Sequence, residues 1–465
     1  MNVSTSENAR NSPTQEHRVP PATTAPSSVR TCEVLVIGGG PAGSTAAALL
    51  AERGFQVTLL DKDHHPRFHI GESLLPANLP LFDRLGLREQ IERIGMRKWA
   101  AEFVSPWHDH KQKFEFGDAW DKSMPFAYQV RRSEFDEILL RNAGSKGATV
   151  IEGCRVRSVE FLPGDGGATI HATHDDGRNE SWQARFVLDA SGRGTLLGNQ
   201  FKAKHRNPRH NSAALYAHFT GARRNDGRDA GNITVFWFDH GWFWFIPLAD
   251  GATSVGAVSW PTYMNTRGKR PVEQFFRDTI ALCPALAERL QGATLVSEVE
   301  ATGNFSYICD RTHGPNYLLL GDAYAFIDPI FSSGVMLAMN SAFVGAETVE
   351  TCLRRPAESA AALARFDRVM KQGPKDFSWF IYRVTNPAMR DLFMGPRNVL
   401  RVKEALLTVL AGDIFGKTPF RPSLLVFKFI YYVNSLAHLK RSLVAWRRRK
   451  TNMRPVSDPE AMAGR

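Results

Sequence analysis

The sequence predicts an α/β fold, in which a dinucleotide-binding unit carries an inserted mixed β-sheet and is followed by a helical C-terminal region. Three observations predict it. A buried strand, a helix and a second strand follow one another in CEVLVIGGG, GSTAAALLAERG and FQVTLLDKD. Segments 103–130 and 210–262 are rich in aromatic and β-branched residues and alternate like strands. From residue 360 onward the pattern is mainly helical.

Length and composition are those of a globular protein. The chain has 465 residues, of which 43% are hydrophobic and 23% charged. The net charge is +11, and residues 421–450 hold eight Lys or Arg and no acid. Because this charge is local and no nucleic-acid recognition motif accompanies it, we expect no nucleic-acid partner.

We divide the chain into four parts. Residues 1–30 are rich in Ser, Thr, Pro and Asn and predict a disordered leader without the apolar stretch of a signal peptide. Residues 31–350 form the nucleotide-binding module, with a substrate-side sheet inserted at about 103–130 and 210–300. Residues 351–450 are the helical region, and 451–465 a disordered tail.

The five cysteines are scattered, with neither a C-x-x-C pair nor zinc-ligand spacing. This predicts reduced thiols, a cytoplasmic location and no metal site.

Smaller elements follow from local patterns. After the first βαβ unit, 71–103 predicts a loop and then helical sequence, and SEFDEILLRNAGSKGATVIEG predicts a helix and a strand. ARFVLDASG and YLLLGDAYAFIDP each predict a strand that ends in a turn, and GVMLAMNSAFVGAETVETCLRR predicts a long helix.

A glycine pattern marks the nucleotide site. Gly38, Gly40 and Gly43 form G-x-G-x-x-G between the first strand and helix, with Pro41 and Ala42 at the helix start. The first glycine permits a tight turn, the second lets a pyrophosphate approach the backbone, and the third lets helix and strand pack closely. Asp61 ends the second strand, where an acid binds a ribose diol. The pattern predicts a Rossmann-type site for NAD or FAD.

Later segments resemble the FAD-dependent monooxygenase fold of the para-hydroxybenzoate hydroxylase type. VLDASGRG (187–194), LLLGDAYAFIDPIFSSGV (318–335) and the arginine of QVRRSEFD (129–136) carry this resemblance. It implies that FAD is the cofactor, that Asp322 meets its ribityl chain and that the 333–335 turn supports its ring. Further cofactor-binding residues implied are Lys62, Arg67, Gly71, Glu72, Ser73, Arg132, Asp189, Ala190, Gly192, Gly321, Pro329, Gly334 and Val335.

Three further motifs resemble the flavin-dependent halogenases: PRFHIGESLLP (66–76), GWFWFIP (241–247) and FIDPIFSSG (326–334). The similarity runs from Cys32 to about residue 430 and includes TNPAMRDLFMGP and VLAGDIFGKTPFRPS. It implies that FAD reduced by a separate flavin reductase, together with oxygen, oxidises chloride or bromide to hypohalous acid. The acid then passes through a tunnel to a lysine, which holds it by hydrogen bonding or as a haloamine.

RKWAAEF (97–103) is similar to the segment that carries this lysine, which nominates Lys98. An ammonium group is a compact donor whose pKa falls on burial. The alternatives are an ordinary surface lysine, or Arg97 or Lys111 in its place. By the same resemblance, backbone amides at Ser333 and Gly334 bind the halide, as a turn of N–H groups can.

Ser333 would also serve as an ordinary helix N-cap. Phe331 stands where tryptophan halogenases carry a glutamate that stabilises the charged ring. We therefore expect an electron-rich phenol or pyrrole as substrate, free or tethered to an acyl carrier protein.

Trp242 and Trp244 lie two residues apart on a predicted strand, so both indoles point to one face. They either fill a core or, with Ile246, Pro247 and Phe331, form a barrier between flavin and substrate. The first alternative needs no ligand, whereas the halogenase resemblance implies the second.

Residues 423–450 combine an apolar run with a basic end, too short and mixed for a membrane span. Three alternatives remain for this segment: a helix that contacts anionic lipid peripherally, a helix packed on the body, or a docking site for an acidic carrier protein. Rival functions for the whole chain are a prenyl reductase of the geranylgeranyl type, an aromatic hydroxylase and a non-catalytic flavin-binding scaffold.

Overall fold

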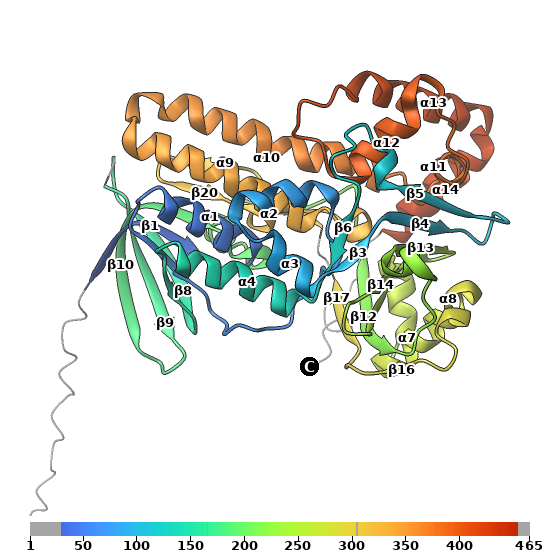
Figure 1. Ribbon diagram of the computed structural model, residues 1–465, viewed down its shortest axis with the longest axis horizontal. Helices are drawn as coiled ribbons and strands as arrows, with labels where there is room; N and C mark the ends of the chain where they lie inside the picture. Colours follow the sequence, from blue (N-terminus) through green and yellow to red (C-terminus); the bar gives the residue numbers. More distant parts are fainter. Residues whose placement is uncertain (1–28, 165, 304–305, 454–465) are drawn as a thin grey trace, which may run out of the picture.

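The computed structural model describes residues 29–164, 166–303 and 306–453. Figure 1 shows a nucleotide-binding half on the left, a second sheet on the right and the C-terminal helices above that sheet. The predicted α/β fold class, with an additional mixed sheet and a helical C-terminal region, is confirmed.

The main sheet of the nucleotide-binding half has a parallel centre. The strand order is β19 (His313–Gly314), β20 (Tyr317–Leu319), β10 (Asn179–Asp189), β1 (Arg30–Ile37), β2 (Val57–Leu60), β7 (Thr149–Ile151). β1 pairs in parallel with β10 and β2, β10 with β20, and β2 with β7.

Four helices lie side by side along this sheet, each touching the next (Figure 1). They are α4 (Arg132–Ser145), α1 (Pro41–Glu52), α9 (Gly334–Arg354) and α10 (Ser359–Ile381). The shorter helices α2 (Leu79–Leu85) and α3 (Arg88–Ile94) occupy the predicted helical sequence in 71–103.

Two features of this half differ from the sequence-based expectation. β1 begins at Arg30, within the predicted leader, and the rest of that leader lies outside the described residues, apart from Val29. An antiparallel pair, β8 (Cys154–Phe161) and β9 (Ala168–His174), extends the sheet from β10 and was not predicted. Its strands have exposed polar faces, so the apolar run that marks a central strand is absent there.

The second sheet combines segments far apart in sequence, as the aromatic alternation predicts. The strand order is β16 (Thr294–Leu295), β12 (Ala213–Thr220), β15 (Thr253–Ser259), β14 (Gly241–Pro247), β13 (Ile233–Phe238), β4 (Ala100–Val104), β5 (Lys111–Glu115), and β17 (Glu300–Gly303) also pairs with β12. β13 pairs with β4 in parallel and with β14 antiparallel.

Parts of the predicted inserts, at about 103–130 and 210–300, lie outside this second sheet. β6 (Ala127–Gln129) instead pairs with β3 (Met96–Lys98) as a separate two-stranded sheet. The stretch 261–289 is helical and forms α6 (Pro261–Met264), α7 (Val272–Ala281) and α8 (Pro284–Arg289). A second small sheet joins β11 (Lys204–Arg206), β18 (Tyr307–Cys309) and β21 (Ala325–Phe326).

The C-terminal region is helical, as predicted, and lies over the second sheet (Figure 1), where α11 (Pro387–Met394) contacts β5 and α12 (Val402–Leu410) contacts the turn Phe116–Asp118 that follows β5. Its last two helices are α13 (Arg421–Ala437) and α14 (Leu439–Asn452). The predicted tail after Met453 lies outside the described residues. Among the described helices, none is both long and apolar enough to cross a bilayer.

β14 is buried on both faces, and successive side chains along it pack alternately into two different cores. Trp242, Trp244 and Ile246 face the core that the C-terminal helices cover. Phe243 and Phe245 face the opposite core, which α7 covers. The prediction that both indoles share one face is therefore confirmed.

Candidate active site

A cavity of about 1080 Å³ lies between the nucleotide-binding sheet and the aromatic sheet. This volume is at the upper end for small-molecule sites, as expected for a dinucleotide with a substrate nearby. Its walls are the glycine turn, the 61–73 segment, the Ala190–Gly194 turn, the indoles of β14 and the turn before α9.

The three glycines have the geometry that the motif predicts. Gly38 has φ +101°, and a Cβ there would lie 2.5 Å from the carbonyl oxygen of Ala190. A Cβ on Gly43 would lie 1.8 Å from the oxygen of Gly38, because helix and turn touch at this point. Gly40 is open to the cavity, where a Cβ would meet nothing closer than Arg67 at 3.8 Å. The N-terminus of α1 therefore presents bare backbone to an anion.

Asp61 follows β2 at the cavity wall and binds the turn itself. Its carboxylate accepts hydrogen bonds from the amides of Gly39 and, at 2.8 Å, Asp63. The Lys62 ammonium donates to the carboxylate of Asp63 at 2.6 Å. Asp61 thus orders the glycine turn, with its remaining acceptor capacity open to a ribose.

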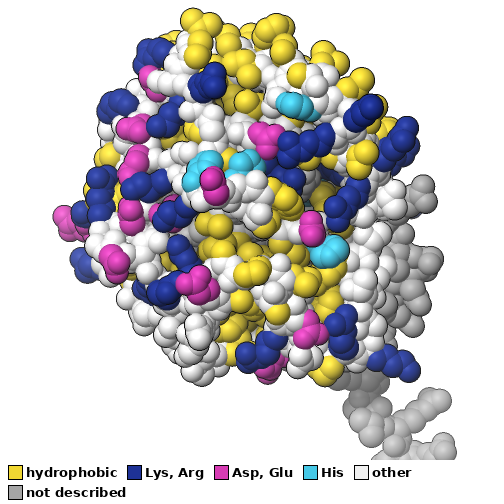
Figure 2. All heavy atoms as spheres, turned by 90° about the vertical axis from the view of Figure 1, so that its right-hand side faces the viewer, with side chains coloured by type: hydrophobic (Ala, Val, Ile, Leu, Met, Phe, Trp, Pro, Cys, Tyr) yellow, Lys and Arg dark blue, Asp and Glu magenta, His cyan; other side chains and the backbone are white. Residues whose placement is uncertain are grey.

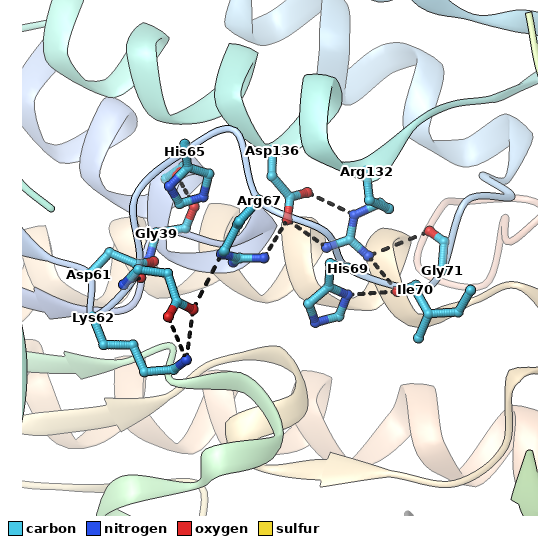
Figure 3. Close-up of polar contacts among 12 residues, drawn as sticks. Gly39, Asp61, Lys62, His65, Arg67, His69, Ile70, Gly71, Arg132 and Asp136 are labelled. Atoms are coloured by element: carbon cyan, nitrogen blue, oxygen red, sulfur yellow. Dashed lines mark hydrogen bonds and ion pairs between the residues drawn. The ribbon is translucent and has the colours of Figure 1, made fainter. Parts of the chain in front are cut away.

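Two arginines of the cavity share one buried carboxylate, that of Asp136 on α4 (Figure 3). Arg132 donates to it from Nε at 2.7 Å and from Nη2 at 2.9 Å, and Arg67 lies 3.5 Å from it. Arg132 also donates to the carbonyl of Ile70 at 3.1 Å. Burial, reinforced by the Arg132 charge, lowers the pKa of nearby His69 to about 4.

Sequence reasoning singled out both arginines and missed Asp136. The acid stands one helical turn after Arg132 in RRSEFD, and this i, i+4 spacing was a signal that could have found it.

The segment after Gly71 connects the cavity to Lys98. Gly71 has φ +112° and lies against Arg132. Glu72 is 1% exposed and accepts from Nε2 of His218 at 2.9 Å, a buried pair that the sequence did not indicate. Ser73, beside it, accepts a hydrogen bond from Lys98 at 2.9 Å.

Lys98 ends β3 and is fully buried, so the alternative of an ordinary surface lysine is wrong. Its Nζ donates to Ser73 Oγ and, at 2.6 Å, to the carbonyl of Leu74, and lies 5.3 Å from the ring centre of Phe116. Within the described residues, no carboxylate lies within ion-pair distance of this ammonium. Burial alone lowers the pKa of Lys98 to about 7.

The two alternatives to Lys98 have ordinary partners. Arg97 is half-exposed and pairs with Glu92, and Lys111 pairs with Glu102 at 3.1 Å. Neither side chain lines the cavity, and Lys98 does not line it either, but Lys98 is hydrogen-bonded to Ser73, which does.

The indoles of Trp242 and Trp244 line the cavity with Ile246, and their ring centres are 6.1 Å apart. Trp244 donates from Nε1 to Ser254 at 3.2 Å and lies flat over Gly256, where a Cβ would be 2.1 Å from the ring. Pro247 ends the strand away from the cavity wall. The two indoles therefore pack in a hydrophobic core and also form part of the cavity wall. The core alternative and the barrier alternative do not exclude each other.

The turn before α9 brings backbone to the cavity through Pro329, Ile330, Ser332, Gly334 and Val335. Ser332 has φ +54°, and a Cβ on Gly334 would meet only Phe326, at 3.9 Å. The amides of Ile330 and Ser332 already donate within the turn, to Asp328 and, at 2.9 Å, to the carbonyl of Pro329, whereas the amides of Ser333 and Gly334 have no acceptor among the described residues. Ser333 itself does not line the cavity.

Two expectations for this turn need correction. Ser333 holds the N-cap position of α9, but its side chain makes no capping hydrogen bond. Asp328 instead caps the preceding 3-10 turn, Pro329–Phe331, by accepting from the amide of Ile330 at 3.1 Å. Phe331 does not line the cavity, because its ring packs among Phe377, Phe380 and Phe393 of the C-terminal region.

Of the two remaining acids predicted to bind the cofactor, Asp189 lies behind the cavity wall and Asp322 is part of it. Asp189 is fully buried, accepts from the amides of Leu197 at 2.8 Å and Ser191 at 3.0 Å, and does not reach the cavity. Ala190 and Gly192, on the turn it orders, do reach it. Asp322 lines the cavity, and burial raises its pKa to about 6. Gly321, with φ +53°, lets this turn approach α9 at Ala338.

Comparison with known proteins decides the family. The sequence model described as tryptophan halogenase matches residues 33–122 and 117–386. The chain belongs to this family.

Relatives of known name agree. A tryptophan 2-halogenase of Chondromyces crocatus is 37% identical over 72% of this chain and 64% of its own length. A 1H-pyrrole-2-carbonyl-[peptidyl-carrier protein] chlorinase of Pseudomonas fluorescens is 30% identical over 83% of this chain and 90% of its own. The chain thus spans somewhat less than two thirds of the first relative and most of the second.

Solved structures show the same fold. A flavoprotein/dehydrogenase of Cytophaga hutchinsonii has a TM-score of 0.80 at 28% identity, covering 88% of this chain and all of its own. The myxobacterial chondrochloren halogenase, an FAD-dependent enzyme, has a TM-score of 0.73 at 30% identity, covering 93% of this chain and 99% of its own. The predicted halogenase family and FAD cofactor are confirmed, and these relatives do not favour a prenyl reductase, a hydroxylase or a scaffold.

The cavity of this halogenase-family chain fits FAD. The open backbone at Gly40 and the N-terminus of α1 suit a pyrophosphate. The Asp322 carboxylate has no hydrogen-bond donor among the described residues, so its acceptors are available to ribityl hydroxyls.

Shortening an indole of the wall is expected to uncouple halide oxidation from halogenation. With the indoles as the expected barrier, Trp242→Leu opens it, so FAD still binds while halogenated product falls at least tenfold and released hypohalite or peroxide rises. Product by mass spectrometry and oxidant by a thiol dye measure both. Trp237→Leu is the control, because Trp237 is buried in the same core away from the cavity. Equal leakage from the two variants would contradict a barrier role.

Proposed function

We propose that this chain halogenates an electron-rich aromatic compound, with Lys98 as the residue that delivers the halogen. The observation that supports it most is the state of Lys98. A fully buried amine without a carboxylate partner among the described residues and with a pKa of about 7 is half neutral near physiological pH. A neutral amine has the lone pair that an electrophilic halogen requires.

The bound cofactor supplies the oxidant, since reduced FAD, oxygen, halide and a proton give oxidised FAD, hypohalous acid and water. The residues of the chain would position the halide and the aromatic substrate. The open amides at Ser333 and Gly334 would hold the halide, and Trp242, Trp244 and Ile246 would keep the aromatic ring away from the flavin. Ser73 stands between the cavity and Lys98, so it marks where hypohalous acid would leave the cavity.

The substrate we propose is a phenol or a pyrrole. Phe331 offers no carboxylate, and its ring is packed away from the cavity, so the charged ring intermediate must be stabilised by its own oxygen or nitrogen substituent. The similarity to a pyrrolyl-carrier chlorinase supports a substrate tethered to a carrier protein. Because another relative is named as a tryptophan 2-halogenase, indole compounds are the competing substrate class that the test must include.

The proposal includes a separate flavin reductase as the electron source and chloride or bromide as co-substrate. It also includes a cytoplasmic location with peripheral contact to a membrane through residues 423–450.

The test supplies the purified protein with FAD, a flavin reductase, NADH, oxygen and bromide or chloride. Phenol, pyrrole and indole probes are offered free and as carrier-protein thioesters. We expect halogen isotope pairs on phenol or pyrrole probes. Oxygen insertion or double-bond reduction without halogen would contradict the proposed function, and halogenation of free tryptophan alone would contradict the substrate class.

The pH dependence follows from the pKa of Lys98. If the neutral amine reacts, halogenation at saturating substrate rises about tenfold between pH 6 and pH 8, because the neutral fraction grows through a pKa of about 7. Turnover of preformed hypobromous acid, with flavin omitted, isolates this step from halide oxidation. A rate that falls over this range would show that the ammonium form holds the oxidant by hydrogen bonding instead.

A further inference from the structure

α13 is apolar on two opposite sides. Leu424, Phe427 and Tyr431 are buried against the body. A second stripe faces outward at the i, i+4, i+7, i+8 and i+11 spacing of one helix face, with side chains 48–68% exposed: Leu425, Phe429, Tyr432, Val433 and Leu436. A helix on the surface of a globular protein normally turns polar residues outward, so this stripe calls for a partner.

α14 continues the apolar surface and adds positive charge to it. Leu439, Leu443, Val444 and Trp446 are 44–65% exposed. Nine of the eighteen exposed large hydrophobic residues in the described chain therefore lie on these two helices. Lys440 and Arg447 stand three or four residues from Leu443 and Val444, hence on the same face.

Figure 2 shows hydrophobic side chains gathered at the top, over the position that α13 has in Figure 1, with Lys and Arg to either side. We name this outer surface of α13 and α14, with its exposed apolar and basic side chains, the α13–α14 face.

The other side of α14 is held to the body, so the exposed face has a fixed orientation. Arg441 pairs with Asp391 at 2.8 Å. Arg449 reaches inward to the carbonyls of Tyr382 and, at 2.8 Å, Arg209, and its Nη2 lies 3.2 Å from Nδ1 of His210. These contacts leave the apolar residues of α14, together with Lys440 and Arg447, turned outward.

The charge on the α13–α14 face limits what can cover it. Residues 421–450 hold no acid, and of their eight Lys or Arg, Arg421, Arg441 and Arg449 bind the body, whereas Lys440 and Arg447 are exposed on the face. A two-fold dimer through this face would place the cations of one copy against those of the other, which disfavours a second copy of the chain. The complementary partner is anionic and accepts a long apolar stripe.

We propose that the α13–α14 face docks on an anionic lipid bilayer. Long aliphatic and aromatic side chains enter the headgroup boundary, while Lys440, Arg447 and neighbouring cations contact lipid phosphates, the pattern of an interfacial helix. No helix needs to cross the bilayer. This inference deepens the proposed peripheral location and is independent of halogenation, which is measured in the same samples.

The experiment is sedimentation of the full-length chain with vesicles of phosphatidylcholine alone or with 30% phosphatidylglycerol. We expect binding to the anionic vesicles only, weakening as NaCl is raised from about 0.05 to 0.5 M. Leu425→Ser/Phe429→Ser/Leu436→Ser and, separately, Lys440→Gln/Arg447→Gln each weaken binding roughly tenfold or more. Leu162→Ser and Arg84→Gln, exposed residues outside the face, are matched controls. Halogenation of a free soluble probe stays unchanged in all variants.

Two outcomes would overturn the proposal. The first is no sedimentation with anionic vesicles. The second is binding that the two face variants retain as fully as the controls. If the first is found together with a loss, in the face variants alone, of turnover on carrier-tethered probes or of a dimer seen by light scattering, the α13–α14 face belongs to a protein partner. A lack of halogenation with vesicle binding intact would contradict the proposed function alone.

Discussion

Replacing Lys98 with methionine is expected to reduce halogenated product by at least a thousandfold while FAD binding stays within twofold of the wild type. Methionine fills the same buried volume without an amine, so the oxidant formed at the flavin has no carrier. Lys98→Arg is not expected to rescue activity, because a guanidinium stays protonated. Product is measured by mass spectrometry and FAD binding by quenching of flavin fluorescence.

Lys111→Met is the matched control, since Lys111 is paired with Glu102 and, among the described residues, has no hydrogen bond to the cavity wall, whereas Lys98 is bonded to Ser73. Full activity of Lys98→Met, or an equal loss in Lys111→Met, would contradict the role given to Lys98.

Lys98→Met is also expected to change how the free energy of unfolding depends on pH. The pKa of Lys98 is about 7 in the folded protein and near 10.5 when the chain unfolds, so between these values the unfolded state binds more protons. The free energy of unfolding therefore rises with pH over this window, by up to about 1.4 kcal/mol per pH unit from this one group. Lys98→Met lacks this contribution, so the difference between wild type and variant changes with pH. Urea unfolding at pH 7.5, 8.5 and 9.5 measures it, and parallel curves for the two proteins would contradict a depressed pKa.

Gly43→Val is expected to abolish FAD binding at accessible concentrations, a loss of more than a hundredfold. A Cβ at this position would lie 1.8 Å from the carbonyl oxygen of Gly38, and a backbone atom cannot move aside without opening the turn that faces the pyrophosphate. We also expect the variant to be destabilised by about 3 kcal/mol or more, as severe overpacking in a core is.

Gly144→Ala provides the comparison. Gly144 lies inside α4, where an added Cβ would meet Val150 at an ordinary 3.9 Å. This change should keep FAD affinity and stabilise the protein slightly, since alanine is the better helix former. Flavin fluorescence titration and thermal unfolding cover both variants, and FAD affinity retained in Gly43→Val would show that the turn is not the binding site.

The sequence predicted best those parts whose signal is local. The βαβ unit with its three glycines follows from a short motif and from an apolar run, and the shared face of Trp242 and Trp244 follows from the strand period. The second sheet was also predictable in outline, because its strands carry dense aromatic alternation.

Features that depend on contacts between distant segments were not predictable in this way. His218 meets Glu72 across 146 residues, and His210 meets Asp328 across 118, with no local pattern to mark either pair. Phe331 looked like part of the barrier, yet its ring packs on helices that come 46 to 62 residues later, and only the tertiary structure shows which way it turns. The burial of Lys98 depends in the same way on Ser73 and Leu74, 25 and 24 residues earlier.

The central claim, that Lys98 carries the halogen from the flavin site to the aromatic ring, is tested most directly by the fate of the oxidant. Wild type and Lys98→Met are supplied with the same reduced FAD, oxygen and bromide, and halogenated product and released hypobromous acid are both counted per oxygen consumed. We expect Lys98→Met to consume oxygen at a similar rate but to release the oxidant instead of forming product. Product formed per oxygen at the wild-type ratio would contradict the claim.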